Sequence, residues 1–357
     1  MAYTTIDDGS EYFTTTLYTG NGSSIDVTNS ANSGNFAPDW LWIKERSATS
    51  SHVIFDTNRP VSGGFAKHVH ANENAAESGD SSELTAFGSN GFSYGSDGKG
   101  NQSSQTYVAW QWKANGGTTT SGGSDDTVST SAHQANTTAG VSIVTYSGTG
   151  TTGHTVAHGL GVAPEVIILK ALNKSQNWRV FHHKTASDGT KRLILDQTNA
   201  QEDAAFLNDT APSSTVFTLG ASDDAWNASD GTYVAYCFAP IQGYSKFGSY
   251  TGNGNADGAF VYTGFKPAWL MVKKSVGNAR AWVIHDNKRD IDNPTASRLD
   301  ANLSDAEQSS GHFDFLSNGF KCRSTEGATN QDTHTFVYFA FAEHPFVSSK
   351  GVPTTAR

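Results

Sequence analysis

Short apolar runs that end in a lysine recur three times along the chain. They read PDWLWIK at residues 38–44, PEVIILK at residues 164–170 and PAWLMVK at residues 267–273. Each run holds four consecutive apolar residues between turn-forming and charged positions, which is typical of a strand buried on both faces of a sandwich. The pattern therefore predicts one fully buried strand in each of three parts of the chain.

Each buried run is preceded by a tyrosine and a tight turn and is followed by an apolar closing strand. The turns read YTGNG at residues 18–22, YSGTG at 146–150 and YTGNG at 250–254, and the closing strands read TYVAW at 106–110, TYVAY at 232–236 and TFVYF at 335–339. The first two opening prolines, Pro38 and Pro164, are as far apart as the tyrosines of the first two closing strands. Equal offsets between distant landmarks indicate a tandem repeat.

The repeats predict an all-β fold of three tandem β-sandwich domains, of jelly-roll or lectin-like type. The expected boundaries are residues 1–113 for an N-terminal lead-in and repeat one, 114–140 for a linker, 141–242 for repeat two, and 243–357 for repeat three and a C-terminal tail. The linker is nearly all Gly, Ser, Thr, Ala and Asn, a flexible composition. We therefore expect repeats two and three to pack together and repeat one to be hinged.

Turn chemistry supports the same fold. Repeats one and three each contain a Ser-Asn-Gly-Phe sequence, at residues 89–92 and 317–320, and Asn-Gly is a strong hairpin signal. The sequence GTGTTG at residues 148–153 matches a dinucleotide-binding pattern, but no helix is predicted after it. Because the other repeats have the same turn without the pattern, we interpret it as a hairpin turn.

Composition narrows the possible functions. The chain has 16% charged residues, 36 Gly, 20 Phe, 12 Tyr and 8 Trp, and its formal net charge is −10. An acidic chain lacks the basic face that nucleic-acid binding requires, so no nucleic-acid partner is expected. The first residues resemble no signal peptide, and no apolar run is long enough to insert into a membrane. We expect a protein that is made and assembled in a cytoplasm.

Two cysteines, Cys237 and Cys322, lie in different repeats, so no disulfide framework is expected. Two histidine pairs, at residues 68 and 70 and at residues 154 and 158, have spacings found in metal sites, but neither has an identifiable third ligand. A polar strand edge is the favoured interpretation of both pairs. Calcium is possible in the turn at residues 253–257, where an ordinary Asx turn is favoured.

Groups for catalysis are also missing from the repeat pattern. Asp56 and Asp286 recur, each followed by an arginine, which is typical of a turn anchored by its own side chain. We find no carboxylate pair and no Ser-His-Asp arrangement, and we assign no catalytic, cofactor-binding or metal-binding residue. The sequence predicts that the protein is not an enzyme and has no cofactor.

Exposed aromatic side chains could form a platform for sugars. Trp40, Trp110 and Trp269 occupy repeat-equivalent strand positions and are predicted to be core residues, with Trp269 buried within its own repeat. Trp112, Trp226 and the turn tyrosines are less constrained, so they are left as candidate surface contacts.

Longer motifs resemble a known family. The sequences GYSKFGSYTGNG at residues 243–254 and VYTGFKPAW at residues 261–269 resemble a repeat in virion proteins of tailed bacteriophages, especially marine, cyanophage-type phages. The sequences FLSNGFK at 315–321, AFAEHPF at 340–346 and MAYTTIDD at 1–8 are similar to the same family. The resemblance covers essentially the whole chain, and repeat two departs from it most.

This resemblance implies a non-enzymatic structural component of the virion, tail fibre-like, with no catalytic residue to carry over. The implied partners are other virion proteins and further copies of the chain, for which we expect a trimer. A host-surface glycan is a further candidate partner. The alternatives are a stand-alone carbohydrate-binding module and, less favoured, a polysaccharide-degrading enzyme.

Contacts with a host or a neighbour are expected from loops, because the repeats keep their strands and differ in their loops. The loops at residues 59–64, 184–189 and 289–294 are the candidates. Their candidate contact residues are Arg59, Asp188, Arg289, Asp290 and Asn293. The glycine turns recur because a tight bend requires glycine, which is a reason of folding.

Overall fold

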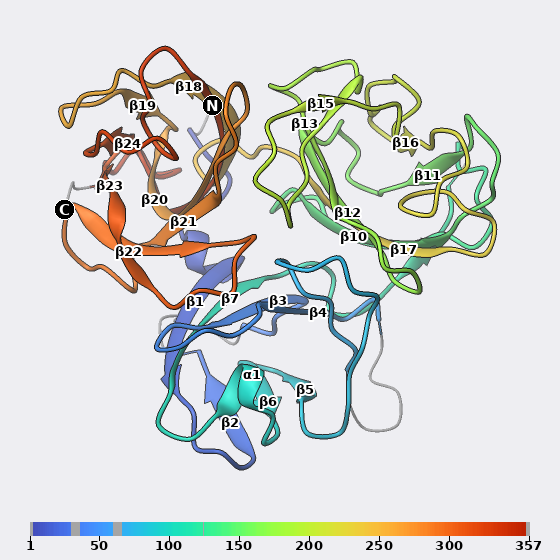
Figure 1. The fold of residues 1–357 in the computed structure, drawn as a ribbon, viewed down its shortest axis with the longest axis horizontal. Coiled ribbons are helices and arrows are strands. Elements are labelled where there is room, and N and C mark those ends of the chain that lie inside the picture. The colour runs from blue at the N-terminus through green and yellow to red at the C-terminus, as the bar shows by residue number, and fades with distance from the viewer. Residues whose placement is uncertain (1–2, 30–35, 60–65, 124, 355–357) are drawn as a thin grey trace.

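The three runs predicted to be buried form central strands of three antiparallel sheets. They are β3 (Trp40–Glu45), β12 (Val166–Ala171) and β20 (Phe265–Lys274), and every residue of β3 and β12 is buried. The computed structural model describes residues 3–29, 36–59, 66–123 and 125–354, and within these ranges the fold is all-β (Figure 1). The predicted fold class is confirmed.

The first repeat is a two-layered sandwich. Its inner sheet has the order β1-β7-β3-β4 and its outer sheet the order β2-β6-β5. Its other elements are the 3-10 turn η1 (Gly9–Glu11), β1 (Phe13–Thr19), β2 (Ile25–Thr28), β4 (Val53–Asp56), β5 (Leu84–Gly88), β6 (Gly91–Tyr94), the short helix α1 (Gly98–Asn101) and β7 (Thr106–Trp112). The predicted Asn-Gly hairpin joins β5 to β6.

The second repeat has a larger inner sheet, of order β13-β12-β17-β10-β9-β8, and two small pairs, β11-β16 and β14-β15. Its other elements are β8 (Thr120–Ser121), β9 (Ala132–Asn136), β10 (Val141–Ser147), β11 (Thr155–Ala157), β13 (Arg179–His182), β14 (Lys191–Arg192), β15 (Glu202–Asp203), β16 (Val216–Thr218) and β17 (Thr232–Phe238). The glycine-rich sequence at residues 148–153 connects β10 to β11, which lie in different sheets and do not pair. It is therefore a turn between two layers, and its interpretation as a hairpin is wrong, although a strand follows it and not the helix that a dinucleotide site requires.

The third repeat is one continuous sheet of order β18-β25-β20-β21-β22-β23-β24-β19, because β22 pairs with strands of both layers. Its other elements are β18 (Ser245–Thr251), β19 (Phe260–Tyr262), β21 (Trp282–Asp286), β22 (Thr295–Asp300), β23 (Gln308–Leu316), β24 (Gly319–Cys322) and β25 (Thr335–Pro345). The sheet curls into a nearly closed barrel whose two end strands, β18 and β19, line the same groove.

Much of the segment 114–140, expected to be a linker, belongs to the second sandwich, namely the described residues 120–123 and 125–136. Strand β9 pairs with β10 along its length and β8 adds to β9, so this segment widens the inner sheet. Val128 is 1% exposed and lies in the core of the second repeat. The composition of this segment does not predict its place in the sheet, because the segment contributes mainly backbone hydrogen bonds and few apolar side chains.

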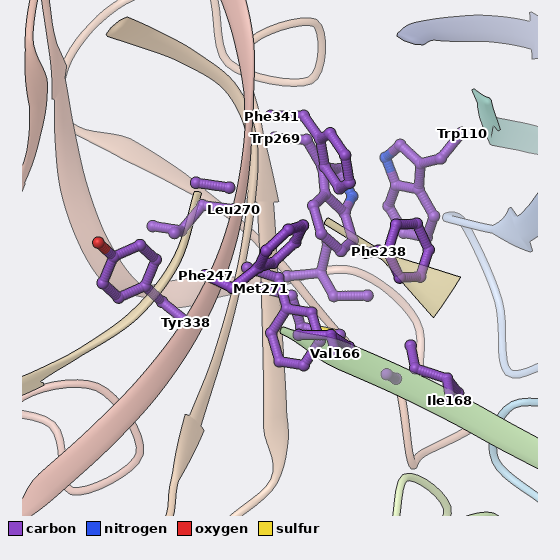
Figure 2. Close-up of a cluster of buried hydrophobic side chains, with 14 of the residues drawn as sticks. Trp110, Val166, Ile168, Phe238, Phe247, Trp269, Leu270, Met271, Tyr338 and Phe341 are labelled. Atoms are coloured by element: carbon purple, nitrogen blue, oxygen red, sulfur yellow. The ribbon is translucent and has the colours of Figure 1, made fainter. Parts of the chain in front are cut away.

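The inner sheets of all three repeats pack around one aromatic core, and the repeats form three lobes around it (Figure 1). The core includes Trp40, Trp42, Trp110 and Trp112 from the first repeat, Ile168, Trp178, Tyr236 and Phe238 from the second, and Trp269, Met271, Phe339 and Phe341 from the third. In Figure 2, side chains of the second repeat and of the first lie against Trp269 and Phe341.

This shared core corrects two expectations. Repeat one is not hinged, because its tryptophans are packed against both other repeats. Trp269 is buried as predicted, at 2% exposure, but between repeats and not within its own, since its ring contacts those of Phe13, Trp110 and Trp112. A strand whose two faces are both apolar buries one face within its own sandwich and the other face in the common core.

Candidate functional site

Arg59, predicted as a surface contact, is buried between the first and second repeats. Its Nε donates to the Asp56 carboxylate at 2.7 Å, and its Nη2 donates to the Ile54 carbonyl at 3.2 Å. Tyr236 of the second repeat donates its hydroxyl to the same carboxylate at 2.8 Å. Arg59 is only 6% exposed. It therefore fixes one repeat against the next, and its prediction as a surface contact is wrong.

Arg289 occupies the equivalent place between the third and first repeats. Its guanidinium pairs with Asp286, donates to the Ile284 carbonyl at 3.1 Å and lies over the ring of Trp110, 5.5 Å from the centroid. Trp110 donates its Nε1–H to the Asp286 carboxylate at 3.0 Å. The Arg289 side chain is fully buried. Its prediction as a surface contact is wrong for the same reason.

The second repeat has His182 at the position of Asp56 and Asp286. Its Nδ1 accepts from the Lys184 N–H at 3.1 Å, as the aspartates accept from the same point of their turns. Its Nε2 lies 3.2 Å from the Tyr338 carbonyl of the third repeat. A carbonyl only accepts, so Nε2 carries the hydrogen. Burial lowers the pKa of His182 to about 3, so the ring is neutral.

These three contacts run in one direction around the molecule, from the first repeat to the second, the second to the third, and the third to the first. Backbone hydrogen bonds follow the same order. They join the Glu77 N–H to the Leu172 carbonyl at 2.7 Å, the Gln201 N–H to the Ser275 carbonyl at 2.8 Å, and the Glu307 N–H to the Arg46 carbonyl at 2.8 Å. One chain therefore closes into a ring of three repeats.

Ring N–H groups make a second set of equivalent bonds, in the opposite direction. In each repeat, an aromatic residue at or just before the start of the strand β4, β13 or β21 donates a ring N–H to a backbone carbonyl of the preceding repeat. The pairs are His52 Nε2 with Asp300 at 3.1 Å, Trp178 Nε1 with His70 at 2.8 Å, and Trp282 Nε1 with Ile194 at 2.9 Å. These equivalences were missed from the sequence because the donor is histidine in one repeat and tryptophan in the others.

The remaining predicted contact residues have a more open position. Asp188 is exposed and accepts from Thr190 within its own turn. Asp290 accepts from two backbone N–H groups at the start of β22, and Asn293 exchanges two hydrogen bonds with Phe315 of β23. These two are half-buried and hold the loop, whereas Ile291 at the tip is 73% exposed.

The glycine turns are held by a residue that sequence reasoning missed. In the third repeat, the buried Asn330 accepts from the Asn253 N–H through its side chain and from the Gly254 N–H through its carbonyl. A Cβ on Gly252 would lie 2.3 Å from a backbone oxygen, and Gly254 has φ +63°. Asn101 and Asn227 act likewise in the other repeats. These bonds agree with a folding role for the turns.

The histidine pair in the first repeat belongs to a buried polar network. His68 Nδ1 lies 2.6 Å from the Glu83 carboxylate, and the Nε2 atoms of His68 and His70 are 3.1 Å apart. Among the residues that the structure describes, no group of three His, Cys, Asp or Glu side chains is arranged to hold a metal ion.

Most of the aromatic side chains left as candidate sugar contacts are buried. Trp112 is 0% exposed, Tyr146 is 2% exposed and Tyr250 is 8% exposed. Trp226 is half-buried and lies against the guanidinium groups of two arginines. In contrast, two aromatic residues that sequence reasoning did not single out, Phe260 and Tyr262, are 48% and 47% exposed.

Phe260 and Tyr262 lie on β19 beside a groove of about 480 Å³ at the boundary of the second and third repeats. The groove is lined by β18 on one side and β19 on the other, and by Glu165, His183 and Lys184 from the second repeat. The alternation of β19, exposed-buried-exposed, places the two aromatic rings outward. This groove is the strongest candidate interaction site of the described chain.

Comparison with known families finds a family model that matches most of the chain. A family described as "Domain of unknown function (DUF7483)" matches residues 8–345, and the chain belongs to this family. The comparison with curated proteins finds no match. Within the described residues, no helix is long and apolar enough to cross a membrane.

Proposed function

We propose that this chain, as a member of that family, is a non-enzymatic structural component of a tailed-phage virion, displayed on the tail, fibre or capsid surface. The proposal begins from the resemblance of residues 243–254 and 261–269 to a repeat of phage virion proteins. It places the protein in the particle after assembly in the host cytoplasm.

The observation that carries the proposal is the closed ring of three sandwiches around one aromatic core. Each boundary is fixed by a buried polar contact, at Asp56, His182 and Asp286. Buried groups of this kind hold parts in a defined arrangement, because breaking one contact leaves a desolvated partner. A body without a hinge suits a part that must keep its shape within a particle.

The chemistry of the described residues agrees with a non-enzymatic role. The recurrent Asp-Arg pairs are buried ion pairs, and both cysteines are buried. Burial raises the pKa of the Cys322 thiol to about 12 and raises that of Cys237 further, so neither is a thiolate near neutral pH. These buried ion pairs and thiols therefore serve the packing between and within repeats.

The proposed partners are other virion proteins and further copies of the chain, with a homotrimer as the specific assembly. The net charge of −10 favours contacts at the particle surface over contacts with the packaged nucleic acid. Light scattering after size-exclusion chromatography measures the assembly directly. If the protein is monomeric at all concentrations measured, the homotrimer is excluded. The role in the virion is tested separately.

Labelling purified particles with a specific antibody tests the virion role. We expect gold label at a constant position on intact particles, together with the protein in their mass spectrum. Particles that are free of the protein would overturn the proposal. A host lysate expressing the protein alone serves as the positive control for the antibody.

A loop variant tests whether the third repeat contacts a host or neighbour. Ile291→Ser with Asp292→Gly changes only the exposed tip and keeps Asp290 and Asn293, which hold β22 and β23. We expect an unchanged melting temperature and reduced particle assembly or adsorption. The matched control is Val162→Ser, which removes a half-exposed apolar side chain from the second repeat. Unchanged assembly and adsorption would exclude this loop as a contact.

A further inference from the structure

The groove between β18 and β19 has a counterpart in the second repeat that is filled by a segment of the chain itself. Residues 125–136, here called the plug, lie between β10 and β11, the strands equivalent to β18 and β19. Strand β9 of the plug pairs with β10, with Gln134 opposite Ile143. Farther upstream, the Thr127 N–H donates to the Thr155 carbonyl of β11 at 3.1 Å.

The plug completes the second sandwich in two ways. It supplies backbone partners to the edge of β10, and it places the buried side chain of Val128 in the core of that repeat. The outward residues of β11, Thr155 and Ala157, are small and lie against it, since their N–H groups donate to Thr127 and Asp126. An extended segment is thus an occupant that this gap accepts.

In the third repeat the equivalent gap is the groove of about 480 Å³. Among the described residues, no strand pairs with the outer edge of β18 or of β19. The bond that joins the two edges comes from a side chain, since Lys246 donates its Nζ to the Tyr262 carbonyl at 2.9 Å. Neighbouring strands lie about 4.8 Å apart and bond directly through their backbones, so a lysine bridge indicates a wider separation.

The backbone of β18 faces this groove in the manner of β10. The Phe247 carbonyl accepts from His183 of the second repeat at 2.9 Å, which shows that its polar groups point away from β25. Strand alternation directs the N–H and carbonyl of Ser249 to the same side, and Ser249 is exposed. Ser249 therefore presents an exposed stretch of strand edge, and such an edge is a template for strand addition.

We propose that the groove between β18 and β19 binds an extended segment of another polypeptide chain, which adds to β18 as the plug adds to β10. The chemistry of the segment follows that of the plug: small Ser, Thr and Ala residues along the edge, and one β-branched apolar side chain directed into the sandwich. Phe260 and Tyr262 flank the segment on the outer side, at the positions where the second repeat has Thr155 and Ala157.

The inference deepens the proposed function, because it describes how a neighbouring virion protein would be held. It can be tested without particles. The probe is a fluorescent synthetic peptide with the plug sequence, DDTVSTSAHQAN, titrated with the purified full chain and followed by fluorescence anisotropy. The control peptide carries proline at alternate positions and so cannot form a ladder.

Ser249→Pro removes the N–H that faces the groove and leaves the ladder with β25 intact. We expect saturable binding of the plug peptide by the parent, at least tenfold weaker binding by Ser249→Pro, and binding within twofold of the parent by Ser249→Ala. If Ser249→Pro does not fold, hydrogen exchange replaces it. Peptide binding should then slow exchange of the Phe247 and Ser249 amides in the parent and leave the amides of β10 unchanged.

Three results would overturn the inference. They are no saturable binding at millimolar peptide, equal binding by the parent and Ser249→Pro, or binding of maltohexaose in the groove with no binding of peptide. The third result would assign Phe260 and Tyr262 to a sugar site. Peptide binding by a protein that is absent from virions would sustain the inference while the proposed function fails.

Discussion

Truncating Trp269 to alanine tests whether the three repeats are one thermodynamic unit. A tryptophan side chain buries roughly 150–250 Å², and at about 25 cal/mol per Å² this is worth about 4–6 kcal/mol. Alanine retains part of that contact, so the expected loss of unfolding free energy is about 3–5 kcal/mol. Trp269 is 2% exposed and touches rings of two repeats, which places the change at the top of this range.

The shift in melting temperature distinguishes a single unit from independent domains. Unfolding entropy is about 2.1 cal/mol/K per residue, so 357 residues unfolding together have about 750 cal/mol/K. A loss of about 3–5 kcal/mol then lowers Tm by about 4–7 °C. If residues 243–357 unfolded alone, the entropy would be about 240 cal/mol/K and the same loss would lower Tm of that domain by about 12–21 °C.

Differential scanning calorimetry at several scan rates, supported by circular dichroism of the strand signal, is the assay. We expect one transition, shifted by the smaller amount. The matched control is Trp226→Ala, which removes a half-buried tryptophan from the periphery of the second repeat and should cost about 1–2 kcal/mol. Two separate transitions, or a Trp269→Ala protein that melts like the parent, would refute the shared core.

Three further predictions follow from the boundaries and the buried groups. The folded pKa of His182 is about 3, below the usual 6.5, so its contribution to stability is complete above about pH 6.5 and is lost as pH falls toward 3. Urea titrations across that pH range measure this loss. The variant His182→Asn should reduce the pH dependence of the unfolding free energy by up to about 1.4 kcal/mol per pH unit. Tyr236→Phe leaves the Asp56 carboxylate without one buried donor and should lower the unfolding free energy by about 1–3 kcal/mol, measured by urea denaturation, with an unchanged value contradicting the boundary contact. Cys237 and Cys322 should react with a thiol reagent only after unfolding, and fast labelling of native protein would contradict their burial.

The strands could be predicted from the sequence because their signals are local. The runs at residues 38–44, 164–170 and 267–273 are apolar on both faces, and turn residues mark their ends. The same local pattern does not say what covers the second face. Trp269 is equally apolar whether its partner is its own outer layer or another repeat. The common core depends on how the three inner sheets are arranged in space, which a local pattern does not specify.

The loop residues and the plug were misjudged for a related reason. Arg59 and Arg289 follow turn-forming aspartates, and charged loop residues are mostly exposed, so a surface position was the natural expectation. Their burial depends on partners from another repeat, Tyr236 and Trp110, which no spacing within one repeat reveals. The plug contributes hydrogen bonds of its backbone, and backbone bonds carry no compositional signal.

The closed order of the boundary contacts limits how this architecture can change in evolution. In solenoid proteins each repeat touches only its neighbours in sequence, so units can be gained or lost and the ends are capped. Here the third repeat returns to the first through Asp286 and Trp110, and neither end is free. A duplication that added a fourth unit would have to break that junction and open the aromatic core. Repeat number is therefore fixed at three by geometry, and diversification is confined to substitutions and to insertions in the outer loops.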